Sequence, residues 1–342
     1  MKTGIVTDER YLAHDMGDFH PESPRRLEAI HSMIREEIEL PCHKIEPREA
    51  EEEEIGWIHK KSYIDTIKNT AGKERVVLDP DTSTSALSYQ AAVLAAGGVM
   101  KASESIMGGE VTNAFAFVRP PGHHAEAGSA MGFCLFNNVA IGAELLLKKF
   151  GLKRILIVDW DLHHGNGTQN SFYDREDVLY FSTHQFPYYP GTGHWDENGA
   201  GKGTGYTVNV PLAGGKRDED YVYIFDNILS PIAEAFAPEF IMVSAGFDIS
   251  IKDPLGGMKI SEQGFGALAR RLINIAERTS GQKILFVLEG GYDLDCLKSG
   301  CKQVLLQMTG KAGKPVIEPE AQPPLLQELK PVIKIHRAKW PV

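Results

Sequence analysis

Short and almost continuous apolar runs recur along this chain, and they limit the folds it can adopt more than any other feature. They are rich in β-branched residues and lie at 114–118, 155–158, 178–182, 206–210, 240–244 and 284–288. Runs without polar alternation are typical of strands buried on both faces, as in a parallel sheet. Segments with helical spacing separate them, at 85–107, 137–150, 220–235, 261–278 and 293–308. This alternation predicts an α/β fold with a doubly wound sheet.

The predicted elements continue along the chain without a domain boundary. The 342 residues include 34 glycines and 19 prolines, which separate elements rather than cluster. We therefore expect a single domain over residues 1–342, with a core at about 20–308 and a C-terminal strap at 309–342. We expect the strap to be extended because it is rich in proline. Its prolines include Pro315, Pro319, Pro323 and Pro324.

Charge and composition narrow the class of partner. The formal net charge is −10, which argues against nucleic acid because phosphate binding requires a basic surface. An acidic surface favours basic substrates such as lysine-rich tails or polyamines, although solubility alone is the simpler interpretation. No uncharged apolar run reaches the roughly 18 residues of a membrane span.

The cysteines and the first residues indicate the compartment. The N-terminus is charged and lacks the apolar segment of a secretory signal. The few cysteines show no C-x-x-C spacing, so we expect a reduced cytoplasm and neither a disulfide framework nor a thiolate zinc site. They are Cys42, Cys134, Cys296 and Cys301.

Titratable residues flanked by glycine follow four of the predicted strands. In chain order they are His123 and His124, then Asp159, Asp161 and His163, then Asp248, and last Tyr292. Ligands of open α/β sheets bind at the carboxyl ends of the strands. We therefore expect these side chains to converge on one site.

Asp159, Asp161 and His163 alternate, so in an extended segment they face the same way. Carboxylate oxygen and imidazole nitrogen are good zinc ligands, and three protein ligands with one water are typical of a catalytic zinc site. We predict that Asp161 and His163 bind the metal and that Asp248 is the third ligand. The alternative is that these groups cap helices, which is the better interpretation of Asp-x-His alone but not of the whole set.

The tandem histidines and Tyr292 suggest acid–base chemistry beside this metal. One imidazole can take a proton from water while the other stabilises charge. Each needs an acceptor on its far nitrogen, and Asp159 and Asn166 are the available candidates. Tyr292 follows two glycines, so its phenol can approach the site and donate to a developing oxyanion. A structural histidine pair and a packing tyrosine are the alternatives.

Other histidines lack metal spacing, and we expect them to be surface or core residues. They include His14, His31, His43 and His336.

Seven motifs run along the chain between about His20 and Met308. They are Arg119–Glu126, Gly132–Cys134, Asp159–Gly167, Pro190–Gly193, Ser244–Asp248, Asp253–Gly256 and Glu289–Tyr292. Together, and in this order, they resemble the histone deacetylase superfamily, which includes acetylpolyamine amidohydrolases and acetoin-utilisation proteins. In detail the chain is similar to the class II branch and its bacterial or archaeal relatives.

The resemblance implies an arginase/deacetylase-like α/β fold with a central parallel sheet of about eight strands flanked by helices. It implies Zn2+ bound by Asp161, His163 and Asp248, with Fe2+ as the alternative metal in the cell. His124 would be the general base and then the general acid, and His123 its electrostatic partner.

In the same way the resemblance implies that Tyr292 polarises the acetyl carbonyl. Asp159 would orient His123, and Asn166 would orient His124. Class I relatives have Asp at the Asn166 position, so this chain follows the class II pattern.

The resemblance also implies K+ sites and an acyl-lysine tunnel. The inner K+ positions are Asp159, Asp161, His163, Ser182 and Thr183, and the outer ones are Phe172, Arg175, Val178 and Tyr221. The tunnel positions are Gly132, Phe133, Tyr189 and Leu255.

We therefore expect a zinc-dependent amidohydrolase that removes acetyl groups from acetyl-lysine or a related acetylated amine. Weakly active relatives have His at the Tyr292 position, so the tyrosine here implies real catalysis. A polyamine-selective relative has Glu at the Leu255 position, so the leucine here favours acetyl-lysine. The alternatives are an acetylpolyamine amidohydrolase, a non-catalytic acyl-lysine binding module and an arginase-like dimanganese hydrolase. The last would need more carboxylates. Acyl preference and homo-oligomerisation stay open.

Overall fold

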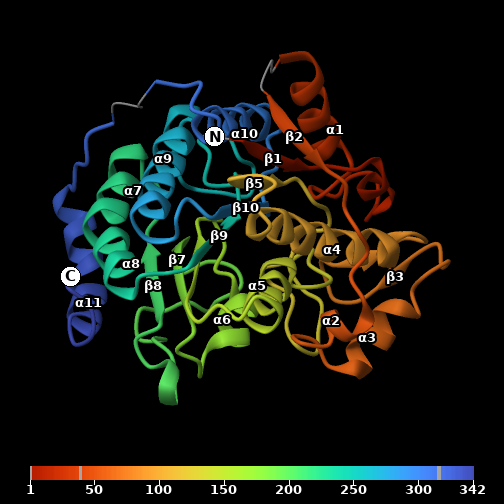
Figure 1. The fold of residues 1–342 in the computed structure, drawn as a ribbon, viewed down its shortest axis with the longest axis horizontal. Helices are drawn as coiled ribbons and strands as arrows, with labels where there is room; N and C mark the ends of the chain where they lie inside the picture. Colours follow the sequence, from red (N-terminus) through yellow and green to blue (C-terminus); the bar gives the residue numbers. More distant parts are fainter. Residues whose placement is uncertain (1, 38–40, 314–316) are drawn as a thin grey trace.

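The structure is a computed structural model that describes residues 2–37, 41–313 and 317–342. Its centre is an eight-stranded sheet in the order β2-β1-β5-β10-β9-β6-β7-β8, and every pairing in it is parallel (Figure 1). The strands are β1 (Thr3–Val6), β2 (Cys42–Ile45), β5 (Asn113–Ala116), β6 (Ile155–Asp159), β7 (Val178–Gln185), β8 (Thr207–Leu212), β9 (Phe240–Ala245) and β10 (Ile284–Leu288). A short antiparallel pair, β3 (Val76–Val77) and β4 (Ser83–Thr84), lies apart from this sheet.

The six predicted strands correspond to β5 to β10, and the expected parallel sheet of eight strands is confirmed. β1 and β2 were not predicted, since each has only four residues and the two central residues of β2 are polar and exposed. The four inner strands β5, β10, β9 and β6 are buried throughout, which explains their continuous apolar runs.

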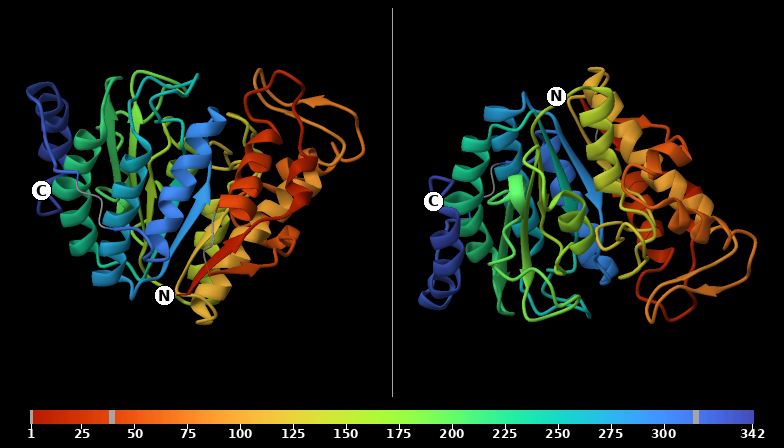
Figure 2. Two further views of the ribbon diagram at one scale, coloured as in Figure 1. Left: turned by 90° about the horizontal axis from the view of Figure 1, so that it is seen from above. Right: turned by 90° about the horizontal axis from the view of Figure 1, so that it is seen from below.

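Helices cover both faces of the sheet, as a doubly wound fold requires (Figure 2). They are α1 (Arg25–Ser32), α2 (Glu52–Ile55), α3 (Lys61–Lys68), α4 (Ser88–Met107), α5 (Asn138–Lys149), α6 (Asn166–Phe172), α7 (Asp218–Ile224), α8 (Ser230–Phe236), α9 (Glu262–Thr279), α10 (Leu294–Met308) and α11 (Pro323–His336). The helix predicted over 220–235 is interrupted, because a π-helical turn at Phe225–Leu229 separates α7 from α8.

The prediction of an extended C-terminal strap is wrong for residues 323–336. Residues 323–336 form α11, whose Pro323 and Pro324 occupy the first turn, where the missing N–H groups cost no helical hydrogen bond. α11 packs beside β8, and Lys216 Nζ lies 2.8 Å from Glu328 Oε1 on this helix. Pro315 lies outside the described residues.

In the described part of the chain, every helix is too short or too polar to cross a membrane.

Candidate active site

The strand order explains why residues far apart in sequence meet. β5, β10, β9 and β6 are consecutive neighbours in the sheet. They are the four strands that precede the predicted site residues, so the side chains after them emerge at one edge. The predicted convergence at the carboxyl ends is therefore observed.

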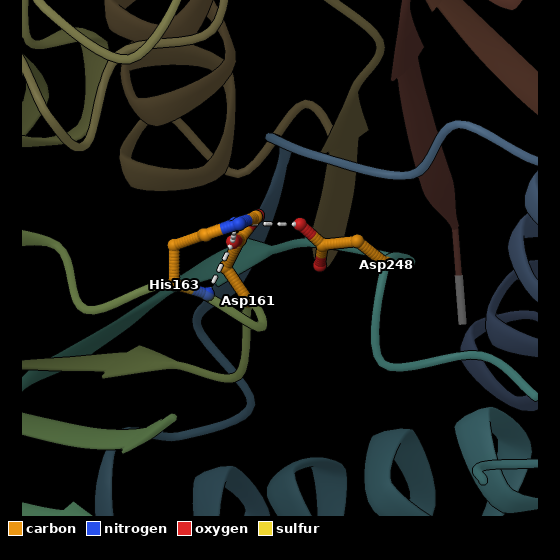
Figure 3. Close-up of side chains that lie close together, drawn as sticks. All are labelled: Asp161, His163 and Asp248. Atoms are coloured by element: carbon orange, nitrogen blue, oxygen red, sulfur yellow. Dashed lines mark hydrogen bonds and ion pairs between the residues drawn. The ribbon is translucent and has the colours of Figure 1, made fainter. Parts of the chain in front are cut away.

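Asp161, His163 and Asp248 form a buried cluster (Figure 3). One ligand atom from each lies within 4.8 Å of the others. His163 Nδ1 lies 3.2 Å from Asp161 Oδ1 and 3.1 Å from Asp248 Oδ2. Two carboxylate oxygens and one imidazole nitrogen directed at a common point are a donor set that suits zinc.

Backbone groups of the neighbouring strand ends hold these carboxylates in place. Gly290 N donates to Asp161 Oδ2 at 2.8 Å, and Leu162 N donates to Asp248 Oδ1 at 2.9 Å. A Cβ atom at Gly290 would overlap both carboxylates. Glycine is therefore required after β10, because only a residue without a side chain lets the backbone approach so closely.

The tandem histidines have the two acceptors that their sequence position suggested. His123 Nδ1 lies 3.1 Å from Asp159 Oδ2, and His124 Nδ1 lies 2.8 Å from Asn166 Oδ1. Both rings are buried, and their centroids are 4.0 Å apart. The two imidazoles are thus adjacent, and each has its own partner on its Nδ1 atom.

The two imidazoles differ in charge. Burial disfavours the charged form of His123, but the carboxylates of Asp161 and Asp159 outweigh it and raise its pKa to about 10. The pKa of His124 is well below its usual value because the ring is buried and lies near His123 and His163. At neutral pH the pair therefore holds one charged and one neutral imidazole.

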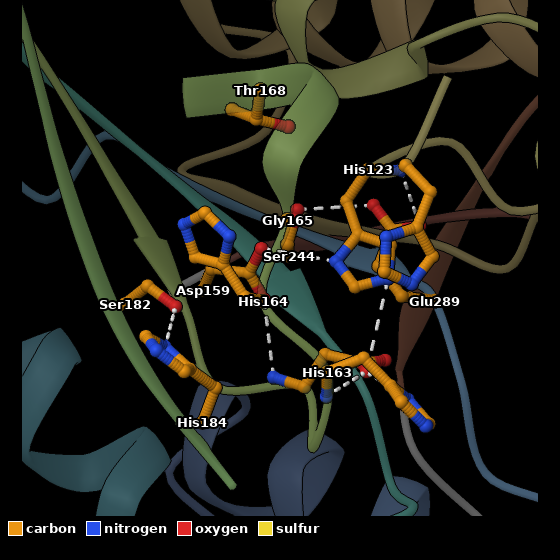
Figure 4. Close-up of polar contacts among 12 residues, drawn as sticks. His123, Asp159, His163, His164, Gly165, Thr168, Ser182, His184, Ser244 and Glu289 are labelled. Carbon is orange, nitrogen blue, oxygen red and sulfur yellow. Dashed lines mark hydrogen bonds and ion pairs between the residues drawn. The ribbon is translucent and has the colours of Figure 1, made fainter. Parts of the chain in front are cut away.

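Glu289, at the start of the Glu-Gly-Gly-Tyr motif, fixes the segment that carries the histidines. Its Oε2 atom accepts from Gly122 N at 2.7 Å and from His123 N at 3.2 Å, while Oε1 accepts from Ser244 Oγ at 3.0 Å (Figure 4). Burial raises the pKa of Glu289 to about 7. No role was predicted for this side chain.

A narrow pocket with a volume of about 80 Å³ opens onto the cluster. It contains all four predicted tunnel positions together with His124, His163 and Tyr292. Asp81 also lines it and was not predicted, because the sequence places it in an ordinary turn after Asp79-Pro80. The complete lining is Asp81, His124, Gly132, Phe133, His163, Tyr189, Leu255 and Tyr292.

Tyr292 is held by groups on both sides of its backbone. Its N–H donates to Asp253 Oδ2 at 2.7 Å, and Arg26 donates from Nε to Gly291 O at 2.7 Å. The Arg26 guanidinium carbon lies 5.1 Å from the centre of the Tyr292 ring. Burial raises the pKa of the Tyr292 phenol well above its usual value, so the phenol keeps its proton and can donate it.

Arg26 belongs to a buried ionic network that the sequence did not reveal. Glu22 pairs with Arg26 at 3.2 Å and with Arg119 at 2.5 Å. Despite burial, Arg119 and the neighbouring cations lower the pKa of Glu22 to about 2. This network joins the segment before α1 to the loop after β5, beneath Tyr292.

The K+ positions implied by the resemblance lie around β7. Ser182 is the register partner of Asp159, which places the inner set at the shared end of β6 and β7. In the outer set, Arg175 stacks on the Phe172 ring with its guanidinium carbon 5.1 Å from the ring centre. Val178 begins β7 and Tyr221 is buried on α7. Cation binding at these positions remains a prediction.

Comparisons with known proteins agree with this arrangement. Residues 20–308 match the histone deacetylase domain family. The chain is 42% identical to a probable deacetylase of Archaeoglobus fulgidus, over 86% of this chain and 82% of that protein. It is 40% identical to histone deacetylase 5 of Arabidopsis thaliana, over 93% of this chain but 51% of that protein.

It is also 38% identical to histone deacetylase 15 of Arabidopsis thaliana, over 99% of this chain and 63% of the relative. The chain thus spans about half to two thirds of the length of these plant relatives. Among solved structures, the crystal structure of the HDA15 HD domain superposes with a TM-score of 0.92 at 38% sequence identity, covering 99% of this chain and 96% of that one.

Proposed function

The chain belongs to the histone deacetylase family, and from that premise we propose that it is a zinc-dependent amidohydrolase that releases acetate from acetyl-lysine or a related acetylated amine. One observation supports this most strongly. Four neighbouring strand ends bring a carboxylate–imidazole cluster that could hold a metal, two adjacent imidazoles with separate partners, and a buried phenol together at one narrow pocket. Metal-assisted amide hydrolysis requires these groups together.

The donor set supports zinc at Asp161, His163 and Asp248, since two oxygens and one nitrogen leave a coordination position open for water or substrate. When bound, the zinc would polarise the acetyl carbonyl and make a water more acidic. The family resemblance alone supports K+ at the positions around β7.

In the proposed reaction His124 accepts a proton from the attacking water at its Nε2 atom. The water oxygen bonds to the acetyl carbon, and Tyr292 donates a hydrogen bond to the oxyanion that forms. The carbon–nitrogen bond then breaks, and His124 returns the proton to the leaving amine. His123 remains charged beside Asp159 and stabilises the negative charge that develops.

The pocket supports a substrate with a slender chain behind the acetyl group. Its walls include the Phe133 and Tyr189 rings and the apolar Leu255 side chain, and the Asp81 carboxyl group also lines it. A lysine side chain has this shape, and an acetylated polyamine shares it. At its own position the apolar Leu255 favours acetyl-lysine, because it offers no charge to bind a distal ammonium group, and Asp81 is the acidic residue of the lining that such a group could meet instead.

Acetate release from protein of known metal content would test the proposal. An acetyl-lysine peptide and acetylputrescine should be compared at equal concentration. We expect faster release from the peptide. Faster release from acetylputrescine would transfer the assignment to polyamines, and no release from either substrate by zinc-loaded protein would refute the proposed activity.

Two variants test the assigned roles. Asp248→Ala should lose bound zinc and with it activity, because only two protein ligands remain. Tyr292→Phe should keep zinc but lower turnover by about 10²–10³, the usual effect of losing one oxyanion donor. Stoichiometric zinc in the first variant, or full activity in the second, would contradict the assignment.

A further inference from the structure

Glu126 lies two residues after His124 and bonds to two asparagines of α6. Its Oε1 atom accepts from Asn166 Nδ2 at 2.6 Å and from Asn170 Nδ2 at 2.8 Å. We infer that Glu126 is a positioning residue for the reaction: it fixes the amide of Asn166, and through that amide it sets which nitrogen of His124 carries the proton. This inference rests on the proposed function, in which His124 is the base.

The first step concerns the orientation of the Asn166 amide. Glu126 Oε1 accepts a hydrogen bond from each asparagine, so the amide nitrogen of Asn166, its only donor, must face Glu126. The other neighbours of this nitrogen are also acceptors, namely His124 O at 3.4 Å and Met131 Sδ at 3.3 Å. The amide oxygen must therefore point away from Glu126, and it lies 2.8 Å from His124 Nδ1.

The second step concerns the tautomer of His124. An amide oxygen only accepts, so Nδ1 of the neutral imidazole must carry the hydrogen. The lone pair is then on Nε2, the atom that accepts the water proton in the proposed reaction. If the Asn166 amide were reversed, its N–H would face Nδ1, and the hydrogen of His124 would move to Nε2. The ring could then no longer act as a base.

The local packing makes this relay rigid. Asn166 and Asn170 lie one helical turn apart on α6, so a single carboxylate can bind both. Thr168 N donates to His123 O at 3.1 Å, and a Cβ atom at Gly167 would overlap the carbonyl of Ala125. The first turn of α6 therefore lies directly against the segment that carries the two histidines.

Substitutions can show whether Glu126 positions the Asn166 amide or only stabilises its own loop. Glu126→Gln keeps the shape but allows either end of its amide to face Asn166, so we expect kcat to fall by about 10–100-fold with little change in KM. Asn170→Ala removes the other contact of Glu126 and is the matched control, with kcat near that of the parent protein. A wild-type kcat in Glu126→Gln would overturn the inference.

A double variant provides the sharper test. In Glu126→Gln with Asn166→Asp, the new carboxylate accepts from both His124 Nδ1 and the Gln amide, so the required tautomer is restored. Asn166→Asp alone places two carboxylates side by side and should be impaired. We expect the double variant to recover most of the kcat lost in Glu126→Gln. Activity no better than that of either single variant would contradict the relay.

The tautomer can also be measured without turnover. ¹⁵N-histidine NMR of the zinc-loaded protein, with the His124 signals assigned by comparison with His124→Gln, should show hydrogen on Nδ1 in the parent and a mixture or reversal in Glu126→Gln. If no substrate is hydrolysed, this measurement still decides the relay. Acetate release with an unchanged His124 tautomer in Glu126→Gln would refute the relay and leave the proposed function intact.

Discussion

The histidines at the carboxyl edge of the sheet and the histidine of α11 are equally buried but differ in their partners. His123 and His124 each bond through Nδ1 to a side chain from a neighbouring element. His336 is 1% exposed, and among the described residues neither of its ring nitrogens has a partner. Burial alone therefore does not distinguish the histidines of the site from His336, whereas their side-chain partners do.

The partners also set the charge of each ring. Burial lowers the pKa of His336 to about 4, and no group opposes it. His123 is as deeply buried, yet the nearby carboxylates raise its pKa to about 10. Removing a ring or its partner at the sheet edge should therefore lower turnover. Removing His336 from α11 should change only the stability of the protein.

The largest effect should follow loss of the neutral ring. His124→Ala removes the proposed base, so turnover should fall by about 10²–10⁴, the usual contribution of a positioned acid–base group. Zinc content should be unchanged, because His124 is not among the proposed ligands. Acetate release and metal analysis of the same preparation would measure both. Parent-like turnover in this variant would remove the distinction between the two regions.

Loss of the partner of the charged ring should have an intermediate effect. Asp159→Asn keeps the shape of the side chain but removes the charge beside His123. We expect kcat to fall by about 10–100-fold, as for other groups that orient a catalytic residue. Steady-state kinetics would measure this, with Tyr180→Phe as the control, because Tyr180 bonds to the same Asp159 oxygen at 3.0 Å. An Asp159→Asn enzyme no slower than Tyr180→Phe would show that the carboxylate charge contributes little.

The sequence predicted the inner sheet and the metal cluster because both follow from local pattern. Strands buried on both faces are continuous apolar runs, and Asp161 and His163 alternate at the end of one of them. β2 was missed because two of its four residues are polar and it lies at the sheet edge. α11 was missed because its first-turn prolines resemble those of an extended segment.

Other site residues were missed because their partners are set only by tertiary packing. Glu22 meets Arg119 across 97 positions of sequence, and Glu289 meets Gly122 across 167. No spacing rule connects such pairs. Glu126 was part of a recognised motif, but its role depends on the side of α6 that faces it, which only the structure gives.

The smallest effect should come from α11. His336→Leu removes a buried imidazole that has no partner among the described residues. The free energy of unfolding at neutral pH should therefore increase by about 1 kcal/mol, and kcat should not change. The pKa of His336 in the folded state, about 4, is below the usual 6.5, so between these values the unfolded chain takes up a proton that the folded chain does not. His336 therefore costs the parent protein stability as pH falls through this range. Urea unfolding at pH 7.5 and pH 5 should show a stability gain for His336→Leu that is larger at pH 5, and an equal gain at both pH values would indicate that His336 has a partner in solution.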